Sequence, residues 1–250
     1  MSVLVLVVTS GVLFHQWRRS IFYTGEPVVT EQKIVQKLYQ LMKDVHEVFQ
    51  AHDIPYWIDW GTLLGAVRHQ GLIPWDDDLD LSVELKDEEK LKTLGQIFQK
   101  LGYGFIPTVI GYKIFYLDGE KLNYKNEDSR FPFCDIFLRE RKNGKIYYVS
   151  RHKRKHLVWG HRDGDEIFVT DQEVYPVKEY RFGELTLHGP QDPLPYFNAI
   201  FGNDWNEIAY QTINHRGRLA RKVKKTLTDH DRKPALPTEP LLDRVTTVAG

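Results

Sequence analysis

The sequence lacks three features that would quickly assign it to a class of protein. It has one cysteine, Cys134, so no disulfide can form within the chain and a multi-cysteine zinc site is excluded. Its 34 basic and 34 acidic residues balance, without the positive excess of a general nucleic-acid-binding protein, so we expect no nucleic-acid partner. It contains no Asn-x-Ser/Thr sequon. The low cysteine count and the missing sequon lean towards a reducing compartment and are also compatible with a Golgi enzyme.

A long hydrophobic run is missing as well. Residues 3–14 are largely apolar and are followed by Arg18 and Arg19, but the run is shorter than the ~20 residues that cross a bilayer. Three interpretations remain open: a signal-anchor, a buried core strand or a membrane-surface segment. A membrane-associated location of the Golgi or ER type is slightly favoured, with a cytoplasmic location as the alternative.

The order of predicted elements indicates an α+β, or mixed α/β, fold. Hydrophobic residues make up 42% of the chain, enough for one core. We expect residues 1–29 to be a hydrophobic segment and linker, residues 30–215 a catalytic domain, and residues 216–250 a basic and then proline-rich tail. The tail is expected to start as a helix and to end as a loose segment.

Periodicity places the elements of the central domain. Apolar residues at helical spacing predict a helix that is capped by Thr30 and ends before Pro55. Further helices are predicted over residues 87–101 and over residues 195–201, the latter ended by Gly202. Strands are expected at residues 56–58, 78–83, 112–117, before an Asp-Gly turn at 118–119, and 134–138, where an Asn-Gly hairpin at 143–144 leads into residues 145–149.

The chemistry is carried first by Asp78 and Asp80. On a strand, side chains two residues apart point to the same face, roughly 6–7 Å apart between Cα atoms. Carboxylates this close repel each other and raise each other's pKa. A hard divalent cation removes that cost, so we expect the pair to bind Mg²⁺ or Mn²⁺. Asp76 shares the face if the strand begins early, and is expected to contact substrate.

A glycine-containing turn precedes these aspartates. Gly61 permits close approach of the backbone to a ligand, and the turn opens a predicted helix whose N-terminal N–H groups favour an anion. Thr62 adds a hydroxyl donor, and Arg68 at the end of the helix is a candidate contact for a diphosphate. A phosphate beside a metal site is the arrangement for phosphoryl transfer.

Asp135 is the candidate third metal ligand. It lies in the apolar strand segment Phe133–Phe137, where an unpartnered carboxylate is costly. It is also placed to accept the proton of an attacking hydroxyl. Asp59 and Lys113 are weaker candidates for substrate contact. The alternative for Asp59 is a residue that only forms a turn, and the alternative for Lys113 is a position on the surface of a strand.

The segments GTLLGAVR at 61–68 and IPWDDDLD at 73–80, with the strand around Asp135, resemble the LicD/fukutin group of the nucleotidyltransferase-like superfamily. Weaker similarity continues at Tyr175–Val177 and at Phe201–Trp205, so the resemblance covers roughly residues 30–210. It implies a mixed sheet flanked by helices, here with a C-terminal helical extension. The chain differs from the larger animal members in lacking a long stem domain and a zinc-binding cysteine cluster.

The resemblance implies transfer of a phospho-alditol or phosphocholine-type group from a CDP-activated donor, such as CDP-ribitol or CDP-choline, to a glycan hydroxyl, with release of CMP. Animal members are Golgi membrane proteins, whereas bacterial ones are cytoplasmic. Two other functions remain open for this chain. One is a nucleotidyltransferase that uses CTP and releases pyrophosphate; the other is an inactive scaffold of a glycosylation complex.

Overall fold

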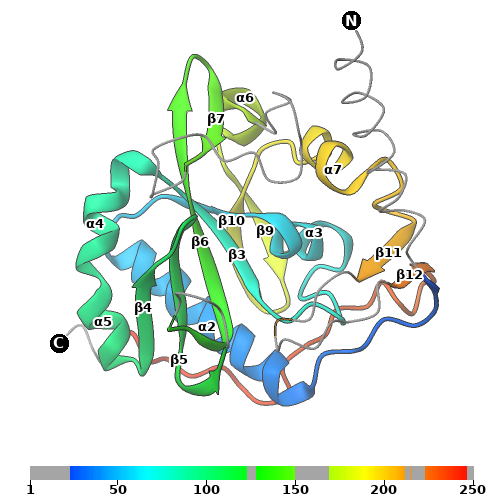
Figure 1. Cartoon of the computed structure of the whole chain (residues 1–250), viewed down its shortest axis with the longest axis horizontal. Coiled ribbons are helices and arrows are strands. Elements are labelled where there is room, and N and C mark those ends of the chain that lie inside the picture. Colours follow the sequence, from blue (N-terminus) through cyan, green and yellow to red (C-terminus); the bar gives the residue numbers. More distant parts are fainter. Residues whose placement is uncertain (1–22, 123–127, 150–168, 212–214, 216–222, 247–250) are drawn as a thin grey trace, which may run out of the picture.

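The computed structural model of the chain describes residues 23–122, 128–149, 169–211, 215 and 223–246. Its centre is a seven-stranded mixed sheet flanked by helices (Figure 1), which confirms the expected fold class. The strands of this sheet are β2 (Tyr56–Ile58), β3 (Leu79–Glu84), β4 (Tyr103–Pro107), β5 (Gly111–Lys121), β6 (Arg130–Lys142), β7 (Lys145–Tyr148) and β8 (Val169–Thr170). The main order is β2-β3-β6-β5-β4, and β7 pairs with both β6 and β8.

The middle of this sheet brings distant residues into register. β3 and β6 are parallel, and Asp80 is the partner of Asp135. β5 and β6 are antiparallel, and Lys113 is the partner of Asp135 on the other side. Three charged residues therefore stand in one row across adjacent strands, although the sequence separates the first from the last by more than fifty positions.

The first predicted helix is confirmed as α2 (Gln32–Ala51). The residue before it is Glu31, and Thr30 is not its cap, since the Thr30 hydroxyl donates to the Asp76 carbonyl oxygen at 2.7 Å. The apolar stripe of the helix is buried in the core, as its periodicity indicated; the buried positions are Ile34, Val35, Leu38, Leu41, Met42, Val45, Val48 and Phe49.

The helix predicted over residues 87–101 is broken in the structure. It consists of a 3₁₀ turn at Leu85–Asp87, α4 (Glu88–Thr93) and α5 (Gly95–Lys100), which lie beside β4 at the left of Figure 1. The predicted apolar stripe is still buried at Leu91, Leu94, Phe98 and Leu101. The break falls at Leu94, directly before Gly95, a residue type that is unfavourable inside a helix.

Two glycine turns had different outcomes. Asn143 and Gly144 have φ of 53° and 72° and connect β6 to β7, which confirms the predicted hairpin. The Asp118–Gly119 turn predicted after residue 117 is wrong: β5 continues to Lys121, and its pairing with β6 shifts register between Phe115 and Glu120. Residues 116–119 form a bulge at this shift, so the strand passes through the predicted turn without ending.

The remaining elements surround the sheet. They are α3 (Trp60–Arg68), α6 (Asp171–Val174), the hairpin β9 (Lys178–Phe182) and β10 (Leu185–Gly189), and α7 (Leu194–Phe201). The predicted helix before Gly202, whose φ is 88°, is thus confirmed. A small separate sheet has the order β1 (Tyr23–Thr24), β12 (Val223–Thr226), β11 (Ile208–Gln211).

The predicted character of the tail is wrong in its described part. Residues 216–222 lie outside the described residues, and from Val223 the chain is strand β12 rather than helix. The segment after it is not loose, because its backbone contacts α2: the carbonyl oxygens of Ala235 and Leu242 accept hydrogen bonds from Tyr39 and Gln40. Periodicity missed this, since hydrogen bonds to an irregular backbone leave no pattern in the sequence.

Residues 3–14 also lie outside the described residues. Among the helices that the described ranges contain, none combines the length and apolar character that a membrane span requires.

Candidate functional site

Three aspartates proposed as metal ligands come together on the neighbouring central strands β3 and β6. Asp78 immediately precedes β3, Asp80 is its second residue, and Asp135 lies beside it on β6. One carboxylate oxygen from each lies within 4.8 Å of the others. We call this group the carboxylate triad. Parallel pairing of β3 with β6 creates it, because that register fixes which residue of β6 stands next to Asp80.

Burial and mutual repulsion disfavour the charged forms of the carboxylates of the triad. Asp78 and Asp80 are 7% and 9% exposed. Burial, followed by the charges of Asp78 and Asp135, raises the pKa of Asp80 well above its usual range. Burial also raises the pKa of Asp78 to about 6, although a neighbouring histidine, His215, opposes the shift. A divalent cation would relieve this repulsion, so the carboxylate set fits Mg²⁺ or Mn²⁺.

Lys113 supplies a positive charge at the edge of the triad. Its Nζ lies 2.7 Å from Asp135 Oδ1, and only 6% of its side chain is exposed. The same ammonium lies 3.4 Å from the centre of the Phe133 ring. The surface strand position considered for Lys113 is therefore wrong; its contact with substrate stays a prediction.

The start of α3 is bound to β3 by reciprocal hydrogen bonds. The Gly61 N–H donates to Asp80 Oδ2 at 3.3 Å, and the Asp80 N–H donates to the Thr62 hydroxyl at 2.8 Å. The Trp60 N–H donates to Asp59 Oδ1 at 2.8 Å. The first amides of the helix thus already face carboxylates of the chain, and Thr62 is 1% exposed. Thr62 orients Asp80; direct phosphate contact by Gly61 or Thr62 stays a prediction.

Gly61 is needed because Asp76 lies against it. A Cβ added at residue 61 would lie 2.5 Å from Asp76 Oδ2. Burial and the neighbouring charges of Asp78 and Asp77 raise the pKa of Asp76 well above its usual range. Asp76 therefore belongs to the same acidic surroundings as the triad, as its position in the sequence indicated.

Asp59 is buried, and the weak expectation that it contacts substrate is not supported. It forms an ion pair with Arg139 of β6, and both side chains are almost completely inaccessible. Ser82 and Tyr148 donate hydrogen bonds to Asp59 Oδ2 at 2.5 and 3.3 Å. Burial would raise the pKa of Asp59, but Arg139 and Ser82 hold it below its usual range. Asp59 thus positions the first turn of α3.

Arg68 lies at the opposite end of α3 from Gly61. Its guanidinium donates to the Trp205 carbonyl oxygen. Burial and the nearby charge of Arg232 lower the pKa of Arg68 to about 10, and Asp76 opposes the shift. Arg68 therefore carries a partly desolvated positive charge near Asp76; its contact with a diphosphate stays a prediction.

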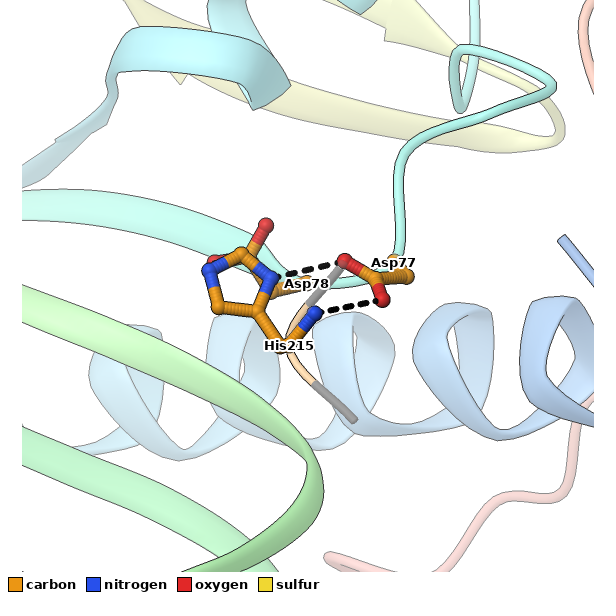
Figure 2. Close-up of side chains that lie close together, drawn as sticks. All are labelled: Asp77, Asp78 and His215. Atoms are coloured by element: carbon orange, nitrogen blue, oxygen red, sulfur yellow. Dashed lines mark hydrogen bonds and ion pairs between the residues drawn. The ribbon is translucent and has the colours of Figure 1, made fainter. Parts of the chain in front are cut away.

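A histidine distant in sequence completes the acidic surroundings (Figure 2). His215 lies 138 positions after Asp77; its Nδ1 is 2.7 Å from Asp77 Oδ1, and its backbone N–H donates to Oδ2 at 3.1 Å. Its Nε2 is 3.5 Å from Asp78 Oδ2. Burial would lower the pKa of His215, but Asp78 and Asp77 raise it to about 9.

Sequence reasoning missed His215 and Arg139. The ten histidines show no local metal-binding spacing, and the partners of His215 are more than a hundred residues away. Arg139 had a weak signal: it directly follows the apolar segment Ile136–Leu138, where a buried charge demands a partner.

Comparison with known proteins supports the resemblance. The family model described as LicD/FKTN/FKRP, nucleotidyltransferase domain, matches residues 53–192. An uncharacterized protein of Rickettsia typhi is 34% identical over 98% of this chain and 75% of that protein. The ribitol 5-phosphate transferase FKRP of Homo sapiens is 30% identical over 40% of this chain and 22% of that protein. The lipopolysaccharide cholinephosphotransferase LicD of Haemophilus influenzae is 41% identical over 20% of this chain and 18% of that protein.

Proposed function

Because the chain belongs to the LicD/FKTN/FKRP nucleotidyltransferase-domain family, we propose that it is a phosphotransferase that modifies a glycan. It moves a phospho-alditol or phosphocholine-type group from a CDP-activated donor, such as CDP-ribitol or CDP-choline, to a glycan hydroxyl and releases CMP. The activities for which FKRP and LicD are named support the class of group transferred. The observation that carries the proposal is the carboxylate triad.

Asp78, Asp80 and Asp135 would hold Mg²⁺ or Mn²⁺ in this reaction. The fit rests on three mostly buried carboxylates whose oxygens lie within 4.8 Å of one another. When bound, such an ion supplies positive charge to the donor phosphates and to the leaving CMP. Loss of any one carboxylate lowers the charge and the number of oxygen ligands together.

The surrounding residues divide the other tasks. Lys113 holds the Asp135 carboxylate at 2.7 Å, which limits its rotation. Asp135 accepts the proton of the attacking hydroxyl. Gly61 leaves space for Asp76, and the Thr62 hydroxyl orients Asp80 by accepting a hydrogen bond from its backbone N–H. Arg68 brings positive charge to the donor diphosphate.

The test uses the purified chain with each candidate donor, CDP-ribitol, CDP-choline and CDP-glycerol, and Mg²⁺ or Mn²⁺. We expect CMP release with one donor in the presence of an acceptor glycan. Asp80→Asn should lower it by about 100-fold or more, since it removes a cation ligand at the reacting phosphate. Circular dichroism checks that the variant is folded.

Asp118→Asn is the matched control, because the side chain of Asp118 is largely exposed on β5 and contacts only Lys37 among the ion pairs of the described residues. It should retain wild-type turnover. Unchanged CMP release in folded Asp80→Asn would contradict the proposal. Labelled CTP separates the nucleotidyltransferase alternative, which predicts pyrophosphate as the product. Absence of nucleotide binding with either cation would favour a scaffold.

A further inference from the structure

His215 enters the site from a part of the chain that the triad does not use. Its imidazole contacts Asp77 and reaches towards Asp78, which already belongs to the triad (Figure 2). Asp77, Asp78 and His215 each offer a ligand atom within 4.8 Å of the other two. This second group therefore overlaps the triad at Asp78 and adds a nitrogen to a set of oxygens.

The imidazole is oriented by two neighbours. Asp77 accepts from the backbone N–H of His215 and lies 2.7 Å from its Nδ1, so both carboxylate oxygens face the same histidine. The Phe133 ring lies edge-on to the imidazole, with 5.2 Å between ring centres and 83° between planes. With Nδ1 directed at Asp77, Nε2 is the nitrogen that points to Asp78.

Such an arrangement is common where histidine binds a metal. The histidine binds through one ring nitrogen, and the other ring N–H donates to a carboxylate that fixes the tautomer. Asp77, which is 8% exposed, is placed as that outer carboxylate, and Nε2 as the ligand atom.

The distance between Nε2 and Asp78 is compatible with one ion bound by both groups. An N–H···O bond joins heavy atoms at about 2.7–3.2 Å. Two ligand atoms that are each ~2.1 Å from one ion, at angles of 90–110°, lie about 3.0–3.4 Å apart. The observed separation of 3.5 Å is an ion-pair distance in the absence of an ion and is close to the span of two ligand atoms on one ion. The charges of Asp77 and Asp78 favour any cation at this position.

We propose that His215 is a metal ligand, binding through Nε2 a divalent cation that Asp78 also binds, with Asp77 positioning the imidazole. The inference rests on the proposed metal-dependent function and adds a nitrogen ligand to it. Imidazole suits transition-metal ions better than Mg²⁺, which prefers oxygen. The site should therefore prefer Mn²⁺ over Mg²⁺ more strongly than an all-carboxylate site does.

The test measures the bound ion directly. Mn²⁺ is added to the full-length chain, and pulsed electron paramagnetic resonance detects the hyperfine coupling of a directly bound ¹⁴N nucleus. Wild type should show this coupling, and His215→Gln should lose it. By calorimetry, His215→Gln should lower Mn²⁺ affinity about 10–100-fold, and Mg²⁺ affinity much less. Asp77→Asn, which keeps the side chain but weakens its acceptor, should give a partial loss of Mn²⁺ affinity.

His230→Gln is the matched control, because His230 is exposed and should leave both the coupling and the affinity unchanged. Mn²⁺ bound to wild type without ¹⁴N coupling, or coupling that persists in His215→Gln, would overturn the inference and leave the metal-dependent function intact. Failure of wild type to bind either cation would instead contradict the proposed function. A wild-type spectrum with bound Mn²⁺ and without ¹⁴N coupling would overturn the inference even if His215→Gln does not fold.

Discussion

At the scale of single residues, the ion pair between Arg139 and Asp59 supports the site from below. Arg139→Met keeps most of the side-chain volume but leaves the Asp59 carboxylate buried without its counter-charge. We expect a loss of about 3–5 kcal/mol in the free energy of unfolding, measured by urea denaturation. Arg141→Met is the matched control on the same strand, because Arg141 pairs with Asp171 at the surface. It should lower the free energy of unfolding much less. Equal losses in the two variants would show that the buried ion pair of Arg139 does not stabilise the protein more than a surface ion pair does.

A second residue-scale prediction concerns Gly61. Gly61→Ala places a methyl group where the Asp76 carboxylate now lies, so that carboxylate must rotate away. We expect CMP release to fall at least about tenfold while the melting temperature changes by only a few degrees. In Gly95→Ala the added Cβ meets Phe105 at an ordinary 3.5 Å, so activity should stay normal. Full activity in Gly61→Ala would mean that the place of Asp76 is unimportant.

At the scale of elements, α2 holds the end of the chain through side-chain amides. The Gln40 amide both donates to the Leu242 carbonyl oxygen and accepts from the Leu242 N–H. Gln40→Ala should cost about 1–3 kcal/mol of unfolding free energy, since it leaves these backbone groups without their partner. Hydrogen exchange at the Leu242 amide should accelerate.

Gln36 offers the comparison for this prediction. It makes similar contacts one turn earlier, to Thr238 and Glu239, but these hydrogen bonds are exposed to solvent, whereas Gln40 is buried. Gln36→Ala should therefore cost less than Gln40→Ala. An unchanged exchange rate at Leu242 in Gln40→Ala would show that other contacts hold this segment.

At the scale of the whole molecule, His69 makes stability depend on pH. Burial and the neighbouring charge of Arg68 lower the pKa of His69 to about 3. Below pH 6.5 the unfolded chain gains a proton there that the folded chain does not. Stability should therefore fall as pH decreases from about 6.5 towards 3, at up to about 1.4 kcal/mol per pH unit from this residue. Melting curves of wild type and His69→Gln measure it, and parallel curves between pH 4 and 7 would contradict the assignment.

Much of the fold could be predicted from local sequence patterns. The apolar stripe of α2, the Asn143–Gly144 hairpin and the i,i+2 spacing of Asp78 and Asp80 each act within a few residues, so the sequence displays them directly. Asp135 was identified because a carboxylate among apolar strand residues is costly.

The contacts that could not be predicted from the sequence join residues that are far apart along the chain. His215 meets Asp77 across 138 positions, and Arg139 meets Asp59 across 80. Strand β12 pairs in parallel with β1 and follows a basic segment whose composition is also that of a helix. Such contacts are decided by tertiary packing, which overrides local preference.

The hydrogen bonds between α2 and the C-terminal segment join residues about 200 positions apart. During synthesis α2 is therefore made about 200 residues before the segment that covers this part of its surface, which stays uncovered in the meantime. Truncated or stalled products would therefore expose it to chaperones and proteases.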